Sequence, residues 1–370
     1  MSSRGRVVIV GGGFAGTRVA QDVARQRNLA DVILIDRKAH FEVTYATLRA
    51  MVEPLTIGRR FAKKYADFVR GDFIHGTVVD INMKEVILDN GRTVPYDYAV
   101  ISSGSYYRTL PILKPSAAMT LEDRERQFED EFTKLTEARS ILIIGGGTVG
   151  VELAGEIADT FPAKNIRLVH GTNRLLDMLK LKAGRIAEKE LRKLGVEIIF
   201  NEMLEQADTD GKSFVSKTTG TSYTADIVYV CIGVSIDTAF MKSHYTSSLT
   251  ERGAIKVDQY LRVKGTDNLF AIGDCNDFPE SKLGYLADKQ GAFTAKNVIR
   301  LLRAGEPSHV KLRQYKPHSM LSLVTIGRRA GIIQIPIGVF QNKLIMSFKQ
   351  KEIFITRALK HVGTVPNEIR

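Results

Sequence analysis

The chain begins with Val7-Val-Ile-Val-Gly11-Gly-Gly13-Phe-Ala-Gly16 and repeats the pattern in its middle as Ile141-Leu-Ile-Ile-Gly145-Gly-Gly147-Thr-Val-Gly150. Each copy indicates a buried strand, a glycine turn and the start of a helix. Glycines at such a turn let the backbone approach a pyrophosphate, whose charge then lies at the positive end of the helix. One copy is a weak signal, but two copies in this context predict two dinucleotides held by one protein.

The elements around the two turns also match. A helix follows each turn, over 14–27 in the first copy and 148–160 in the second, and another strand follows each helix. A later strand ends at a glycine in both copies, at Gly104 and at Gly233. This repetition predicts an α/β fold with two Rossmann-like dinucleotide-binding domains.

The residues at the end of the second strand differ between the copies. Asp36 lies 20 residues past Gly16, where a carboxylate can bind a ribose 2′-hydroxyl. His170 lies 20 residues past Gly150, so no acid repels a 2′-phosphate there. We therefore predict that NADPH is accepted alongside NADH; an ordinary strand-end histidine is the alternative.

Three further carboxylates follow the glycine turns or a buried strand. Glu152 and Glu156 lie on one face of the helix after the second turn. Glu152 is nearer the helix start and is the better candidate to contact the nicotinamide or its ribose, whereas a solvated face is as good an interpretation for Glu156. Asp274 ends a buried strand just before a helix, where an acid could bind a flavin ribityl hydroxyl; alone, Gly-Asp indicates only a turn.

These differences indicate which nucleotide each copy binds and how the chain divides into domains. Asp36 and Asp274 favour FAD at the first copy, and His170 favours a nicotinamide nucleotide at the second. We predict a discontinuous FAD-binding domain over 1–115 and 250–308 and an NAD(P)H-binding domain over 116–249. Strand-like runs then predict a small α+β domain over 309–370.

The chain of 370 residues carries 53 Lys and Arg against 41 Asp and Glu, a formal net charge of +12. This charge favours an anionic partner, which could be a phosphate-rich cofactor, a membrane surface or nucleic acid. No nucleic-acid-binding motif accompanies it. The two cysteines, Cys231 and Cys275, form no C-x-x-C pair. We therefore predict neither a disulfide framework nor a metal site, and expect a reducing compartment.

The sequence has no uncharged apolar run of the roughly 20 residues needed to span a bilayer. We see no signal peptide at its start, and Ser2 stands where myristoylation requires glycine. We expect a cytoplasmic protein that would meet a membrane or lipid droplet from the surface, as a monomer or a homodimer.

Several motifs in a fixed order resemble the pyridine nucleotide-disulfide reductase-like superfamily along most of the chain. They are the two glycine turns, Thr93-Val-Pro-Tyr-Asp-Tyr-Ala-Val-Ile-Ser-Ser-Gly104, Val151-Glu-Leu-Ala-Gly-Glu156 and Leu269-Phe-Ala-Ile-Gly-Asp274. The segment 41–54, Lys282-Leu-Gly-Tyr-Leu-Ala287 and the compact C-terminus resemble the apoptosis-inducing-factor-like ferroptosis suppressor proteins within it. The quinone motif of type II NADH dehydrogenases is only partly echoed by Ala287-Asp-Lys-Gln290.

The resemblance implies FAD, or 6-hydroxy-FAD, with NADH or NADPH as co-substrate, and reduction of quinones of the ubiquinone and vitamin K types in an antioxidant role. It places a lysine near the flavin at Lys360, as a catalytic residue; an exposed helix lysine is the alternative. Lys114 or Arg108 adds a phosphate contact. The predicted cofactor-binding residues are Gly11, Gly12, Gly13, Phe14, Ala15, Gly16, Asp36, Arg49, Val79, Gly104, Lys114, Gly145, Gly147, Gly150, Glu152, His170, Gly233, Asp274 and Tyr285.

A quinone would need an apolar slot beside the flavin. The side chains offered for it, most of which could equally be core, are Tyr285, Leu286, Phe293, Met320, Leu321, Phe340 and Phe354. Basic residues of the same half would suit docking on anionic lipid, or could simply keep the protein soluble: Lys289, Arg328, Arg329, Lys343, Lys349 and Lys351.

Two other functions compete with quinone reduction. One is monodehydroascorbate reduction, and the other is a flavin-dependent redox sensor that binds nucleic acid. Sulfide:quinone oxidation is disfavoured because the chain lacks paired cysteines.

Overall fold

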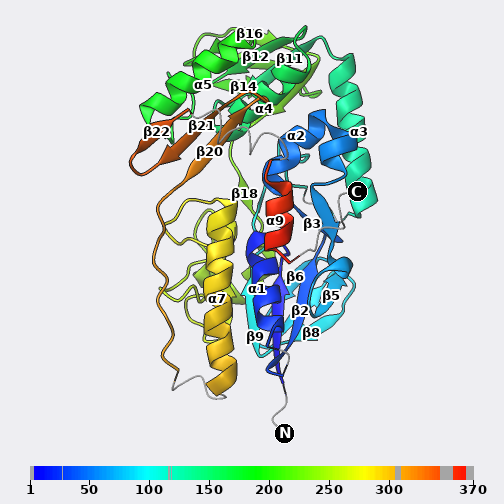
Figure 1. The fold of residues 1–370 in the computed structure, drawn as a ribbon, viewed down its shortest axis with the longest axis vertical. Coiled ribbons are helices and arrows are strands. Elements are labelled where there is room, and N and C mark those ends of the chain that lie inside the picture. The colour runs from blue at the N-terminus through cyan, green and yellow to red at the C-terminus, as the bar shows by residue number, and fades with distance from the viewer. Residues whose placement is uncertain are drawn as a thin grey trace.

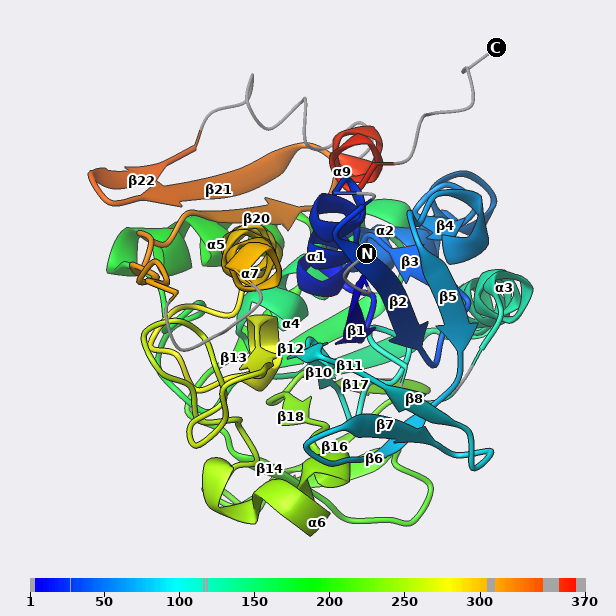
Figure 2. The same cartoon turned by 90° about the horizontal axis from the view of Figure 1, so that it is seen from below.

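The structure is a computed structural model of the chain (Figures 1 and 2). It describes residues 4–26, 28–115, 117, 119–304, 310–341 and 353–363. Two parallel sheets lie in opposite halves of the molecule, the first below the second in Figure 1. The predicted α/β class with two Rossmann-like units is confirmed.

The first sheet has five parallel strands, and its order is not the order of the sequence. Side by side they are β19 (Leu269–Ala271), β9 (Tyr98–Ile101), β1 (Gly5–Val10), β2 (Ala30–Asp36) and β5 (Asp72–His75). The edge strand β19 comes from beyond the second unit and pairs with β9. Helices α1 (Phe14–Ala24) and α7 (Gly284–Ala304) pack against each other beside this sheet.

The second sheet has four parallel strands. In spatial order they are β13 (Glu197–Ile199), β12 (Asn165–Val169), β11 (Ser140–Ile144) and β17 (Ile227–Val230). Helix α4 (Thr148–Thr160) follows the second glycine turn with the predicted bounds. Two further helices are α5 (Leu181–Lys193) and α3 (Leu121–Glu137), and Thr120 and Asp123 form a capping box at the N-terminus of α3.

Smaller elements, most of them without a sequence prediction, surround the two units. The antiparallel strands are β3 (His40–Glu42), β4 (Ala62–Lys64), β6 (Val78–Ile81), β7 (Glu85–Leu88), β8 (Thr93–Pro95), β10 (Ser105–Tyr106), β14 (Leu204–Gln206), β15 (Ser213–Ser216), β16 (Ser222–Thr224) and β18 (Ser235–Ile236). The short helices are α2 (Thr47–Val52) and α6 (Lys242–Tyr245). Strands β10 and β18 pair across the boundary between the two units.

The C-terminal region forms an antiparallel sheet of β20 (Ser322–Ile326), β21 (Ala330–Ile335) and β22 (Gly338–Phe340). Pro336 and Ile337 form the turn between β21 and β22, which pair antiparallel. This sheet packs on α4 and α5. Helix α9 (Ile355–His361) lies instead beside α1, where the Gln21 amide donates to the Val362 carbonyl (Figure 2).

Candidate functional site

The two glycine turns have the same geometry. Gly11 and Gly145 begin the turns at φ +98° and +109°, a region open chiefly to glycine. A Cβ at Gly16 would come within 1.9 Å of the Gly11 carbonyl oxygen, and one at Gly150 within 1.9 Å of the Gly145 oxygen. The repeated motif therefore encodes the same close contact of helix and turn twice.

The two turns are held by different acceptors. The Gly12 N–H donates to Asp36 Oδ2 at 2.5 Å, and the Lys38 N–H donates to the other oxygen of Asp36 at 2.7 Å. The Gly146 N–H donates to His170 Nδ1 at 3.1 Å. Burial lowers the pKa of His170 from its ordinary value of 6.5. The imidazole therefore takes, in neutral form, the turn-holding role that a carboxylate has in the first copy.

Tyr65 also holds the first turn, a role that no sequence signal suggested. Its hydroxyl donates to the Gly12 carbonyl oxygen at 2.7 Å from 53 positions away. Burial raises the pKa of Tyr65 well above its ordinary value, so the hydroxyl stays a donor.

A cavity of about 310 Å³ runs from the first glycine turn to the end of β19 and reaches α4. It brings together most of the residues predicted for the first dinucleotide. Its lining includes Gly11, Gly13, Phe14, Ala15, Asp36, Gly104, Lys114, Glu152 and Asp274. A Cβ added at Gly13 or Gly104 would meet no atom within 4 Å, so the backbone leaves room for a ligand at both positions. The shape and polar groups fit a dinucleotide.

Asp274 lies at one end of this cavity in a polar cluster. Its Oδ2 accepts from the Ser105 hydroxyl at 2.6 Å and from Lys114 Nζ at 2.9 Å. Burial raises the pKa of Asp274, but Lys114 and Ser105 outweigh it and leave the pKa below its usual value. The predicted Lys114 thus lies beside Asp274, and the carboxylate stays ionised where it can accept a ligand hydroxyl.

Lys282 also lines the cavity, close to the start of α7. Its ammonium donates to the Asn276 carbonyl and to Asn276 Oδ1, both at 2.8 Å. We assigned it no role from sequence, although it begins a motif that carried the resemblance. Burial lowers its pKa. Its hydrogen-bond acceptors are neutral, while the carboxylates of Asp274, Asp277 and Glu280 partly oppose the effect of burial on its pKa. Lys282 is thus a cation at the lining of the cavity.

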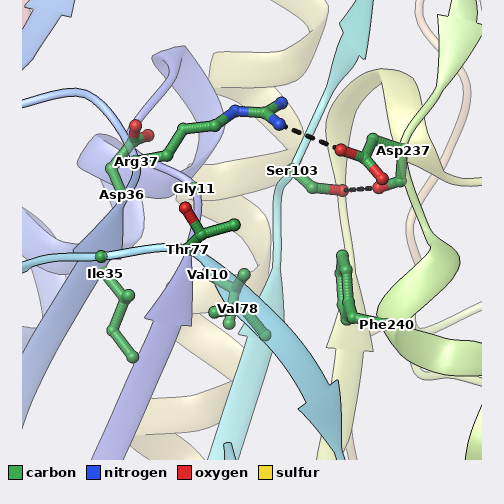
Figure 3. Close-up of a pocket in the computed structure, with 11 residues that line it drawn as sticks. Val10, Gly11, Ile35, Asp36, Arg37, Thr77, Val78, Ser103, Asp237 and Phe240 are labelled. Atoms are coloured by element: carbon green, nitrogen blue, oxygen red, sulfur yellow. Dashed lines mark hydrogen bonds and ion pairs between the residues drawn. The ribbon is translucent and has the colours of Figure 1, made fainter. Parts of the chain in front are cut away.

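A smaller pocket of about 60 Å³ adjoins Asp36 (Figure 3). Arg37 crosses it to pair with Asp237 at 3.0 Å, and the Ser103 hydroxyl donates to the Asp237 carbonyl oxygen. Val78 lines this pocket, whereas Val79, named from the sequence, has a side chain that is 49% exposed. The segment that carries Val78 and Val79 thus lies next to Asp36, and Val78 is the one that lines the pocket.

Arg49 lies away from the cavity lining. Its guanidinium donates through Nε and Nη2 to the carboxylate of Glu156, the latter bond at 2.8 Å, and both residues are buried. The pair joins α2 to α4. Glu156 therefore lies inside the protein and does not belong to a solvated helix face.

Glu152 is the member of the acid pair that reaches the cavity. Its Oε1 accepts from the Thr325 N–H at 2.8 Å and from the Thr325 hydroxyl at 2.9 Å. Thr325 is on β20, so the C-terminal sheet fixes this carboxylate.

Tyr285, Lys360 and the other apolar side chains offered for a quinone slot do not line the cavity. Tyr285 anchors a neighbouring segment, since its hydroxyl donates to the Ser319 carbonyl and accepts from the Leu321 N–H. None of the apolar side chains offered for a quinone slot, all in the described part of the chain, lines the cavity. Lys360 is exposed on α9, where it fits the alternative of an ordinary helix lysine.

Gly147 and Gly233 leave open space for an added Cβ, as at the first turn. Of the basic residues, Lys289 and Arg329 are exposed, whereas Arg328 is paired with Glu53 and Asp159. Lys343, Lys349 and Lys351 lie outside the described residues. Among the residues that the structure describes, no cluster of metal ligands occurs, and no helix has the length and apolar character required to cross a bilayer.

The family model for pyridine nucleotide-disulphide oxidoreductases matches residues 5–300. The chain belongs to this family. Its relatives include apoptosis-inducing factor homolog A of Dictyostelium discoideum, 31% identical, with 96% of this chain and 91% of the relative aligned. Ferroptosis suppressor protein 1 of Homo sapiens is 30% identical, with 97% of this chain and 96% of the relative aligned. The resemblance seen in the motifs is confirmed.

Solved structures with the same fold include two flavoprotein-like neighbours of low identity. One is NDH2 from Plasmodium falciparum in complex with NADH, with TM-score 0.75, 16% identity and 97% and 96% coverage of the two chains. The other is the sulfide:quinone oxidoreductase from Aquifex aeolicus, with TM-score 0.78, 14% identity and 97% and 91% coverage. This family member is an oxidoreductase, and its fold is that of these enzymes.

Proposed function

We propose that the protein is a FAD-dependent oxidoreductase that takes hydride from NADH or NADPH and passes electrons to a quinone of the ubiquinone or vitamin K type. One observation carries the proposal. A single cavity extends from the first glycine turn past Asp274 to Val149 and Glu152 on the helix of the second turn. Two dinucleotides held by the two turns would therefore meet within it.

The residues of the first unit fit FAD along the length of the cavity. The first turn and the N-terminus of α1 would hold the pyrophosphate, and Asp36 the adenosine ribose. Asp274, kept ionised by Lys114, would accept a ribityl hydroxyl. Bound FAD supplies a ring that accepts hydride and can release electrons one or two at a time. Lys282 would place a positive charge close to that ring.

The residues of the second unit fit a nicotinamide nucleotide. Gly145, Gly147 and Gly150 would receive its pyrophosphate at the N-terminus of α4, and Glu152 would orient the nicotinamide end. Because His170 is no acid, no carboxylate stands at the strand-end position itself, and the nearest one is Asp177, whose Oδ2 lies 3.9 Å from His170 Nε2. The protein's contribution is to align the reacting rings and exclude water from between them.

Electrons must leave the flavin without passing through thiols. The two cysteines are free, and Cys275 is buried. Burial raises the pKa of Cys231 to about 12 and also raises that of Cys275. Both groups are thiols at neutral pH and poor nucleophiles. A diffusible quinone is the acceptor that this arrangement favours, and the relationship to ferroptosis suppressor protein 1 supports an antioxidant role.

The proposed domain division follows the sheets. Residues 1–115 and 250–308 would bind FAD, 116–249 would bind NAD(P)H, and 309–370 would complete the site and face the acceptor. The passage of β19 into the first sheet supports the discontinuous first domain.

The test compares acceptors and cofactor retention in purified protein. We expect bound flavin near one per chain, and NADH oxidation that depends on ubiquinone or menadione rather than on ascorbyl radical. Asp274→Asn should lower the ratio of flavin to protein at least about tenfold, since the ribityl contact loses its ionised acceptor. Asp267→Asn, at a carboxylate 90% exposed, is the matched control. Flavin-free protein that binds nucleic acid tightly and oxidises no NADH would refute the proposal.

A further inference from the structure

Two of the most exposed large apolar side chains in the described residues lie at neighbouring turns. Met178, just before α5, is 88% exposed, and Ile337, in the β21–β22 turn, is 84% exposed. Lys180 joins the two segments: its N–H donates to Gln334 Oε1 at 2.8 Å and its Nζ to the Pro336 carbonyl at 2.9 Å. Figures 1 and 2 both show α5 alongside β21 and β22. Leu181, 51% exposed, adds a third apolar side chain to the same surface.

Basic side chains flank these apolar residues. Lys182 and Arg185 are exposed on α5 and appear in no ion pair among the described residues. We call the surface formed by Met178, Leu181, Ile337, Lys182 and Arg185 the hairpin surface. Its combination of protruding apolar tips and unpaired cations is that of segments that lie in the interface of a bilayer.

We propose that the hairpin surface docks the protein on an anionic lipid bilayer, with Met178 and Ile337 inserted among the headgroups and Lys182 and Arg185 bound to lipid phosphates or carboxylates. Charge complementarity favours this occupant over a second copy of the chain. A two-fold contact would place the basic side chains of one copy against those of the other.

The hairpin surface is also connected to the cavity. The sheet that carries Ile337 continues through β21 to β20, where Thr325 hydrogen-bonds Glu152 at the cavity. Docking would thus hold the acceptor side of the enzyme at the lipid in which a hydrophobic quinone dissolves. Only the benefit of docking, access to quinone dissolved in the lipid, rests on the proposed function. Binding to lipid itself needs neither nucleotide nor quinone.

The experiment measures co-flotation of the oxidised full-length protein with vesicles of phosphatidylcholine, alone or mixed with phosphatidylserine. We expect binding to the mixed vesicles that weakens with salt, and little binding to phosphatidylcholine. The double variant Met178→Asp with Ile337→Asp should lower the partition coefficient at least about tenfold, because two charges would enter the interface. Lys182→Glu with Arg185→Glu should lower it by a similar factor.

Matched variants control for charge and folding. Met83→Asp changes a methionine 74% exposed in another turn, and Arg126→Glu with Lys134→Glu reverses two exposed charges on α3. Both should float like the wild type. Absent flotation of the wild type, or equal flotation of all variants, would overturn the proposal. The proposal would also be overturned if the wild type bound no lipid but sedimented as a dimer, and if the Met178 and Ile337 changes dissociated that dimer.

Turnover with a water-soluble quinone is measured separately on every variant. Normal turnover shows that a variant is folded, so its loss of flotation reports docking. If neither the wild type nor any variant reduces quinone, the proposed function is wrong. The flotation result still shows whether the hairpin surface binds lipid.

Discussion

At the scale of single residues, protonation can break one contact of the second glycine turn. His170 accepts the Gly146 N–H only while Nδ1 carries no proton. Asp177 Oδ2, 3.9 Å from His170 Nε2, opposes the effect of burial on the pKa, and the Thr172 hydroxyl contacts Nε2 at 3.0 Å. The pKa is nevertheless lowered, so the folded protein favours the neutral ring.

This shift predicts a pH dependence of stability. Below pH 6.5 the unfolded chain takes up a proton at His170 that the folded protein resists. The contribution of His170 to stability is therefore present above pH 6.5 and is lost as the pH falls toward the lower folded-state pKa. His170→Asn keeps an acceptor that does not titrate, so its melting temperature should fall less than that of the wild type under acid. Calorimetry across this range checks it; parallel curves would contradict it.

The same position predicts nucleotide selectivity. In His170→Glu a carboxylate would repel the 2′-phosphate and accept a ribose hydroxyl. We expect kcat/KM for NADPH to drop at least about tenfold while that for NADH changes little. His170→Gln, which adds no charge, is the control. Strict rejection of NADPH by the wild type would show that the prediction is wrong.

At the scale of elements, an ionic junction, buried at Arg49 and Glu156 and partly exposed at Arg328, joins three parts of the chain. Arg49 on α2 pairs with Glu156 on α4, and Arg328 in the β20–β21 turn pairs with Glu53 at 2.8 Å and Asp159 at 3.2 Å. Burial raises the pKa of Glu156 even though Arg49 lowers it. The junction fixes the helix that carries Glu152.

Removing one member of the buried pair should be costly. Arg49→Met leaves the Glu156 carboxylate buried without its partner, and we expect a loss of about 3–5 kcal/mol in the free energy of unfolding. Adding Glu156→Leu should restore most of it, because the double variant buries no lone charge. Urea unfolding of both proteins measures the difference. A single variant within about 1 kcal/mol of the wild type would count against a structural role for the pair.

Sequence patterns predicted the helices in which apolar residues recur with helical spacing over several turns. Helix α4 has its predicted bounds, and α1 ends at Ala24, shortly before the predicted end. The antiparallel strands β14 to β16 went unpredicted because they have three or four residues each and mostly polar side chains. The Arg49–Glu156 pair spans 107 positions, and no local pattern connects residues so far apart. Asp36 and Asp274 could be predicted at the cavity because each lies at or just after the end of a buried strand, whereas Lys114 came from the resemblance alone, as an alternative to Arg108.

At the scale of the whole molecule, the electron path is predicted to need no sulfur. A variant with Cys231→Ser and Cys275→Ala should keep most of its quinone turnover, with any loss within about twofold, because both thiols are protonated. Stopped-flow reduction of the flavin by NADH should likewise be unchanged. Loss of turnover with flavin content intact would show that a thiol participates.

The position of β19 at the edge of the first sheet also sets an order for assembly during synthesis. Residues 140–230 supply the whole second sheet before residues 269–271 leave the ribosome. Until then β9 presents an unpaired edge, and at roughly 5–20 residues per second the synthesis of the chain between β9 and β19 takes on the order of 10–30 s. Asp274 lies three residues past β19, so the nascent chain can complete its second sheet before it has the last strand and the acid of the cavity. A chain cut short before residue 269 would therefore have the second sheet finished and β9 left as an open edge at which another chain could pair.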